Sequence, residues 1–335
     1  MLTVTARGEE QTSASAERFA VVVFNPVNVA EEKLGSVVRA AARAGWAEPR
    51  FVETTEDDPG RGMTEQAVAD GASLVIAAGG DGTVRAVTEG LRGTDVPLGL
   101  LPLGTGNLLA RNLKLPLVSL DNAAKVCFEG ESRHIDIGVF RYTAEPAGDP
   151  VEKVFLVMAG IGLDAEMFTA TRPGLKRRLG WLAYVDGGVR AARKSRRHPF
   201  RYQLDGGTEK SVTAHSIVVG NCGLLPGNLL LLPEAEVDDG ELDIVALRPD
   251  GFLGWAKLTW KVIWDNGVLR RSHAGRKFMG PDKDVRTLLS LRGRRLVLRT
   301  DTPVAFEIDG DPEGEAVEIV ARVESGALAV RVPAK

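Results

Sequence analysis

The order of apolar and polar positions divides the chain into two parts with different rhythms. As far as about residue 115, short apolar runs alternate with segments whose apolar residues recur every three or four positions. A short apolar run predicts a buried strand, and the three-to-four spacing predicts a helix. The predicted strands are 19–24, 50–53, 74–78 and 96–101, and the predicted helices are 31–44, 64–69, 84–91 and one that starts at residue 108. This alternation is typical of a parallel sheet with helices on both faces.

Beyond residue 130 the pattern changes to strand-like runs separated mostly by turn residues. The runs are 134–140, 154–160, 200–204, 212–220, 242–247, 295–300, 305–308, 317–323 and 328–332, with helical segments at about 176–193 and 252–268. Such a series predicts an antiparallel β-sandwich. We therefore expect a disordered tail over 1–18, a nucleotide-binding α/β domain over 19–133 and a β-sandwich domain over 134–335. Whether the last strand returns to the first domain is left open.

Length, composition and charge narrow the class of protein. The chain has 335 residues, of which 44% are hydrophobic and 26% charged, and its net charge is −3. This balance fits a soluble globular protein of two domains and argues against a general nucleic-acid binder. The two cysteines, Cys127 and Cys222, are too few for a disulfide framework or a zinc site and suit a reducing cytoplasm. No apolar run approaches the roughly 20 residues that span a bilayer, and residues 1–17 do not resemble a signal peptide.

Two glycine-rich loops follow consecutive predicted strands, at 79–83 (GGDGT) and 104–107 (GTGN). A strand, a glycine loop and a helix together point free backbone N–H groups at an anion. Because parallel strands end at one edge of the sheet, both loops are expected in one crevice. Neither loop has the P-loop pattern or contains a lysine. The negative charge of a bound phosphate would then be neutralised by backbone N–H groups, a metal and Arg85 or Arg111. A position on a solvated helix face explains these two arginines equally well.

Carboxylates form the second group of candidates. Asp81 lies inside an anion-binding loop, where it must carry a metal or accept a proton; the alternative is an ordinary turn in which it caps a helix. The stretch 233–243 is crowded with acids that suit a hard cation, or else form an exposed turn. Asp311 follows an Asp-Gly turn and is a candidate to face a substrate hydroxyl, the alternative being a simple hairpin.

Taken in order, these stretches resemble the diacylglycerol kinase catalytic family, the bacterial lipid kinases related to sphingosine kinases. The matching segments are Asn25-Pro26, 79–83, 102–111, 233–243 and 309–311. The GGDGT segment is also shared with NAD kinases, whereas its combination with G-T-x-N and D-D-G-x-L-D is more specific. The resemblance implies ATP-dependent transfer of the γ-phosphoryl group to a lipid hydroxyl, of diacylglycerol or a related lipid, in a cleft between the two domains.

The resemblance also implies a role for each motif. Asp311 occupies the position of the family's proposed base, and the choice between Asp311 and Asp81 is left open. One Mg²⁺ would be held by Glu236, Asp239 and Glu241, in part through backbone carbonyls. ATP would bind at Asn25, Pro26, Val27, Asn28, Val29, Thr54 (or Thr55), Gly79, Gly80, Asp81, Gly82, Thr83, Val84, Arg85, Gly104, Thr105 and Asn107.

Several positions depart from the family pattern. Asn28 and Val29 replace a serine and a glycine, Arg85-Ala86 replaces Asn-Glu, Leu108 replaces an aspartate, and Asp311 is shorter by one methylene than the usual glutamate. Two alternatives therefore stay open beside the lipid kinase. One is an enzyme similar to NAD kinase that acts on a soluble substrate. The other is a nucleotide- or lipid-binding regulator with weakened catalysis.

A lipid kinase must meet its substrate at a membrane. Between residues 172 and 198 the chain has nine Lys or Arg residues and a single acid, Asp186, with Trp181 and Tyr184 among them. This composition favours peripheral attachment to an anionic membrane surface, at the inner face of the cytoplasmic membrane. The alternative is a solvated helix on the sandwich. We expect a lipid substrate, no nucleic-acid partner, and leave a homodimer open.

Overall fold

A computed structural model describes residues 18–42, 45–145, 148–162, 197–225, 229–230, 232, 234–249 and 288–334. The predicted tail up to residue 17, the predicted helices at 176–193 and 252–268, and the basic segment up to residue 196 lie outside these residues. Within them, no helix is long and apolar enough to cross a membrane.

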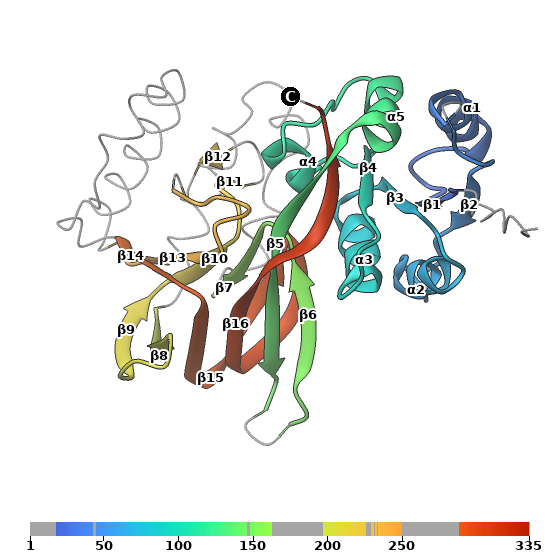
Figure 1. The fold of residues 1–335 in the computed structure, drawn as a ribbon. Coiled ribbons are helices and arrows are strands. Elements are labelled where there is room, and N and C mark those ends of the chain that lie inside the picture. Colours follow the sequence, from blue (N-terminus) through green and yellow to red (C-terminus); the bar gives the residue numbers. More distant parts are fainter. Residues whose placement is uncertain are drawn as a thin grey trace, which may run out of the picture.

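The N-terminal part is a parallel sheet between two layers of helices (Figure 1). Its strands are β1 (Ala20–Phe24), β2 (Arg50–Glu53), β3 (Leu74–Gly79) and β4 (Leu98–Pro102), in the order β4-β3-β1-β2. The helices are α1 (Glu31–Ala41), α2 (Arg61–Ala69), α3 (Asp81–Leu91), α4 (Leu108–Asn112) and α5 (Leu120–Glu129). The predicted α/β fold is confirmed.

Strand β3 shows why the sheet is covered on both faces, because all six of its residues are buried. Val75 belongs to the core that α3 covers through Val87. Its neighbour Ile76 belongs to the core that α1 and α5 cover through Leu34 and Cys127. Successive side chains of a strand point to opposite faces, so a continuous apolar run requires a helix layer on each side.

Some predicted boundaries in this part were wrong. Helix α1 ends at Ala41, and α2 starts at Arg61 instead of 64. The early start of α2 follows from Asp58, whose carboxylate accepts hydrogen bonds from the backbone N–H of Gly60, Gly62 and Met63. Helix α5 was not predicted, although Ser119 caps it by accepting a hydrogen bond from the N–H of Asn122.

The C-terminal part consists of antiparallel strands, as predicted. They are β5 (Glu131–Thr143), β6 (Val151–Phe155), β7 (Met158–Ile161), β8 (His198–Leu204), β9 (Lys210–Ala214), β10 (Ser216–Gly220), β11 (Leu224–Leu225), β12 (Leu229–Leu230), β13 (Leu242–Leu247), β14 (Leu288–Gly293), β15 (Arg295–Ile308) and β16 (Asp311–Val332). A second core lies under β7, β10, β13 and β15 and includes Phe306 and Ile308.

In this part, too, several strand ends predicted from the apolar runs were wrong. The runs 154–160 and 212–220 each form two strands, whereas the runs from 295 to 308 and from 317 to 332 belong to the single strands β15 and β16. The break after β6 arises because Asp309 accepts the N–H groups of residues 156–158 that a ladder would otherwise use. β16 stays continuous across a register shift against β5 between Glu324 and Leu328.

Strand β16 joins the two parts. Val330 near its end pairs in parallel with Leu98 of β4, so the described strands of both parts belong to one sheet, apart from β11 and β12, which pair only with each other. The predicted domain boundary at 133–134 falls inside β5, which pairs with the same strand β16 along most of its length. The sheet edge of the first part is thereby held against the second part, and the loops between them can meet.

Candidate active site

The two glycine loops touch each other at the carboxyl edge of β3 and β4. The N–H groups of Leu103 and Gly104 donate to the carbonyl of Gly79 at 3.0 and 3.1 Å. A Cβ atom on Gly104 would lie 2.5 Å from the Cα of Gly80, so only glycine allows this approach. Asn107 braces its own loop by bonding both the N–H and the carbonyl of Gly104, at 2.9 and 2.8 Å. The two predicted phosphate-binding loops therefore lie side by side at one edge of the sheet, and the crevice between them stays a prediction.

Asp81 ties these loops together. It is the first residue of α3, and its Oδ1 accepts a hydrogen bond from the N–H of Leu108 at 2.6 Å. Burial raises the pKa of Asp81, and the charge of Asp311 raises it further, while the N–H groups of Leu108 and Asn107 lower it. Asp81 thus holds the start of α4, the helix after the second loop. At its own helix, no side chain caps the first turn of α3.

The predicted nucleotide residues of β1 and β2 lie at the same edge of the sheet. Phe24 pairs with Ala78, and the next residue, Asn25, donates its N–H to the carbonyl of Ala78 at 3.1 Å. Thr54 donates its N–H to the carbonyl of Phe24. Val29, in contrast, is a buried core residue packed with α1, and Val84 of α3 is likewise buried in the core.

The hairpin between β15 and β16 closes over the first glycine loop. Oδ2 of Asp311 lies 3.6 Å from the position of a Cβ on Gly82. Arg85 of α3 contacts Asp311 at 3.3 Å and Glu313 at 3.0 Å, and donates to the carbonyl of Ile308 at 2.8 Å. The structure therefore brings the region of Asp81 and that of Asp311 to one place. Arg85 joins the two parts of the chain, and its predicted contact with phosphate stays a prediction.

Two buried acids beside this hairpin were missed as functional candidates. Asp309 accepts three backbone N–H groups, from Leu156, Val157 and Met158, at 2.8–3.0 Å. Burial raises its pKa to about 6, although these donors and Arg85 lower it. Glu307 is 4% exposed. The alternation of Phe306, Glu307 and Ile308 was the signal that places Glu307 on the face opposite the apolar side chains, whereas Asp309 lies in the turn after β15.

The acidic turn contains an arginine where the resemblance implies a metal. Arg292 of β14 forms ion pairs with Asp239 and, at 2.9 Å, with Glu241, and lies 3.8 Å from Asp243. Burial raises the pKa of Asp243 to about 6, an effect that Arg292 opposes. Over the described part of the chain, no group of three His, Cys, Asp or Glu side chains is placed to hold a metal ion. The side chains of Asp239 and Glu241 are instead paired with Arg292. Glu236, which is exposed, Asp239 and Glu241 remain predictions as Mg²⁺ ligands.

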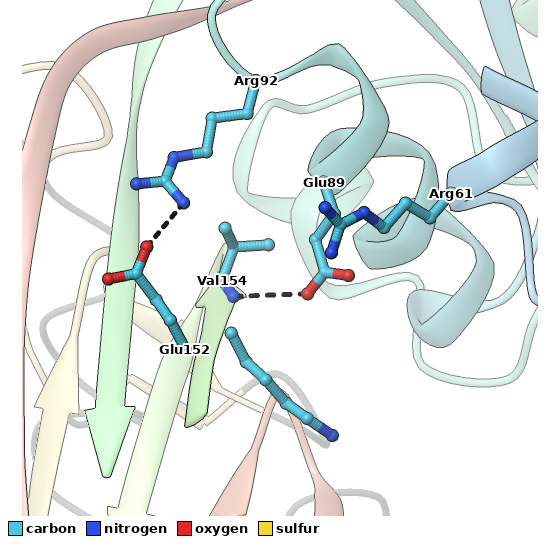
Figure 2. Close-up of a pocket in the computed structure, with 6 residues that line it drawn as sticks. Arg61, Glu89, Arg92, Glu152 and Val154 are labelled. Atoms are coloured by element: carbon cyan, nitrogen blue, oxygen red, sulfur yellow. Dashed lines mark hydrogen bonds and ion pairs between the residues drawn. The ribbon is translucent and has the colours of Figure 1, made fainter. Parts of the chain in front are cut away.

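A small pocket lies elsewhere, between α2, α3 and β6 (Figure 2). It is lined by Arg61, Glu89, Arg92, Glu152, Lys153 and Val154 and has a volume of about 40 Å³. That volume holds a few water molecules and excludes a nucleotide. Glu89 accepts the N–H of Val154 at 3.4 Å, and Arg92 contacts Glu152 at 2.8 Å. The pocket is therefore part of the joint between the two parts of the chain.

The sequence of this chain matches two protein-family models and several known proteins. Residues 20–140 match the family described as "Diacylglycerol kinase catalytic domain", and residues 157–260 match the "YegS C-terminal NAD kinase beta sandwich-like domain". A "Probable lipid kinase YegS-like" of Pseudomonas fluorescens is 30% identical over 95% of this chain and 96% of its own length.

Two further relatives add to this result. A "Diacylglycerol kinase" of Mycobacterium tuberculosis is 34% identical over 57% of this chain, and the matched segment spans 60% of that relative. A crystal structure of a diacylglycerol kinase from Bacillus anthracis has the same fold, with a TM-score of 0.64, 20% identity, and coverage of 94% of this chain and 97% of that one.

Proposed function

Because the chain belongs to the diacylglycerol kinase catalytic-domain family, we propose that it is an ATP-dependent lipid kinase acting on diacylglycerol or a related lipid. The observation that carries the proposal is the approach of Asp311 to the first glycine loop, 3.6 Å from the Cβ position of Gly82. A phosphate held by that loop and a hydroxyl beside Asp311 would be neighbours. Phosphoryl transfer depends mainly on such positioning and on neutralisation of the phosphate charge.

In the proposed mechanism, the glycine loops, Asp81 and Asp311 have separate roles. The uncapped first turn of α3 and the loop glycines supply N–H donors to the phosphates. Asp81 is engaged with the N–H of Leu108, so we assign it to holding the loops. Asp311 is 55% exposed beside the first glycine loop, and we assign it as the base that accepts the hydroxyl proton. Mg²⁺ bound with ATP would neutralise phosphate charge, and no step is assigned to the acidic turn.

We also propose that the protein acts at an anionic membrane surface, since its proposed substrate resides in a bilayer. The support is the composition of the segment 172–198, with nine basic residues and one acid. Each basic residue near such a surface is worth about 1 kcal/mol, screened within a Debye length. Attachment should therefore be reversible and weaken with salt.

A substrate panel tests the proposed activity. Labelled ATP would be offered with diacylglycerol, sphingosine, ceramide, phosphatidylglycerol and NAD. We expect labelling of a lipid, and a loss of about 10²–10⁴-fold in rate for Asp311→Asn. Asp301→Asn is the matched control, because Asp301 is an exposed acid of β15, the other strand of the same hairpin, and is paired with Arg201. Labelling of NAD alone would favour the soluble-substrate kinase, and ADP binding without turnover would favour a regulator.

A further inference from the structure

Glu307 on β15 is a buried carboxyl group that nothing in the proposed mechanism uses. The residue is 4% exposed, and both carboxyl oxygens lie out of contact with solvent. Within the described part of the chain, neither oxygen has a hydrogen-bond partner. Leaving a polar group in this state costs free energy unless a partner arrives from outside the chain. Glu307 therefore requires either a proton, a ligand, or both.

The side chain of Glu307 lies on the face of β15 opposite the sandwich core. Its neighbours Phe306 and Ile308 point into the sandwich core. Asp309, in the turn directly after β15, bonds the segment 156–158, which belongs to the same core as α3. Across the sheet, Glu307 pairs with Gly160 of β7 and Pro312 of β16, neither of which has a polar side chain.

The charges around this position are mostly negative. Asp309 and Asp311 face Glu307 from the same hairpin. The nearby cations Arg85 of α3 and Lys153 of β6 are engaged with Glu313, and Arg85 also with Asp311. Burial, followed by the charges of Asp309 and Asp311, raises the pKa of Glu307 to about 8. At neutral pH the side chain is therefore a neutral carboxylic acid with one O–H donor.

We propose that Glu307 donates this hydrogen bond to an uncharged oxygen of the acceptor lipid, such as an ester carbonyl next to the reacting hydroxyl. The inference rests on the proposed function and extends it to a substrate-binding residue. It follows from the position of Glu307 on the hairpin that carries Asp311, because Glu307 pairs across the strands with Pro312, the residue next to Asp311. A phosphate group does not suit this place, because Asp309 and Asp311 repel it, whereas a neutral oxygen accepts the bond without a charge penalty.

Kinetics of three variants test the proposal. Glu307→Met keeps the length of the side chain and removes the donor, so the KM for the lipid should rise about tenfold while the KM for ATP stays the same. Glu307→Gln supplies an N–H donor and should restore most of that loss. Glu315→Met, at an exposed position of the neighbouring strand β16, is the matched control. An unchanged lipid KM in Glu307→Met, or a rise that affects ATP equally, contradicts the proposal.

The pH dependence of the lipid KM is a second test, because a purely structural role of Glu307 would not change it. In the wild type the lipid KM should rise as the pH passes about 8, because the ionised carboxylate has no O–H to donate. This rise should vanish in Glu307→Gln, which does not titrate. If the alkaline rise persists in the glutamine variant, another group causes it and Glu307 is not the donor.

A binding measurement separates this proposal from the proposed function. In protein labelled with ¹³C-glutamate, the Glu307 signal, assigned by its loss in Glu307→Gln, should titrate near pH 8 and shift when dioctanoylglycerol is added. A shift without any lipid phosphorylation would support the contact and overturn the kinase activity. Lipid phosphorylation without a shift would do the reverse. A titration midpoint near 4.5 overturns the neutral donor whatever the activity is.

Discussion

Replacement of Glu307 by glutamine should stabilise the fold, and increasingly so as the pH rises. The carboxyl group has an ordinary pKa of 4.5, and burial raises it to about 8 in the folded chain. Between these values the folded state keeps a proton that the unfolded state has released. The contribution of Glu307 to stability is thus fully present below about pH 4.5 and is lost as the pH rises toward 8. At 1.36 kcal/mol for each pH unit, the loss amounts to about 5 kcal/mol.

Urea unfolding of the wild type and of Glu307→Gln, followed by circular dichroism, measures this loss. Asp309 and Asp243, whose pKa values are raised to about 6, titrate in both proteins, so the difference is read above pH 6. There the advantage of the variant should grow by about 1.4 kcal/mol for each pH unit and level off above pH 8. Glu315→Gln, an exposed control, should show no such trend. A difference that stays constant with pH would refute the reasoning.

Two further predictions concern the acidic turn and the membrane. Arg292→Gln leaves the carboxylates of Asp239 and Asp243 without their cation, so the melting temperature should fall by about 3–8 °C. Mg²⁺ at about 10 mM should bind these carboxylates in the variant and restore part of the lost melting temperature. The wild type and Arg201→Gln, which breaks an exposed pair, should be indifferent to Mg²⁺; a wild type that melts earlier in chelator would show a resident ion instead. Replacement of Arg193, Lys194 and Arg196 by glutamate should reduce sedimentation with anionic liposomes, and binding unaffected by this change or by salt would exclude this segment as the docking surface.

Local features of the sequence were sufficient for the alternating strands and helices of the first part, although not for α5 or the exact helix ends. The all-buried run of β3, the glycine loop after it and the helical spacing of Val84, Val87 and Leu91 could be recognised because each depends on neighbours within a few positions. The order of the motifs was likewise enough to identify the family. The strand ends after β6 and β9 were not recognisable, because the bonds that create such breaks come from distant segments, as Asp309 does for residues 156–158.

The partners of the charged side chains were decided only by the tertiary structure. Arg85 has the sequence position of a phosphate ligand, yet it reaches the hairpin at Ile308 and Asp311, more than two hundred residues away. Arg292 meets Asp243 because β14 and β13 pair in that register. Glu307 is buried without a partner for the same kind of reason, since Gly160 and Pro312 are its cross-strand neighbours. Periodicity determines which face a side chain takes, but the energy of a charge depends on what the fold brings opposite it.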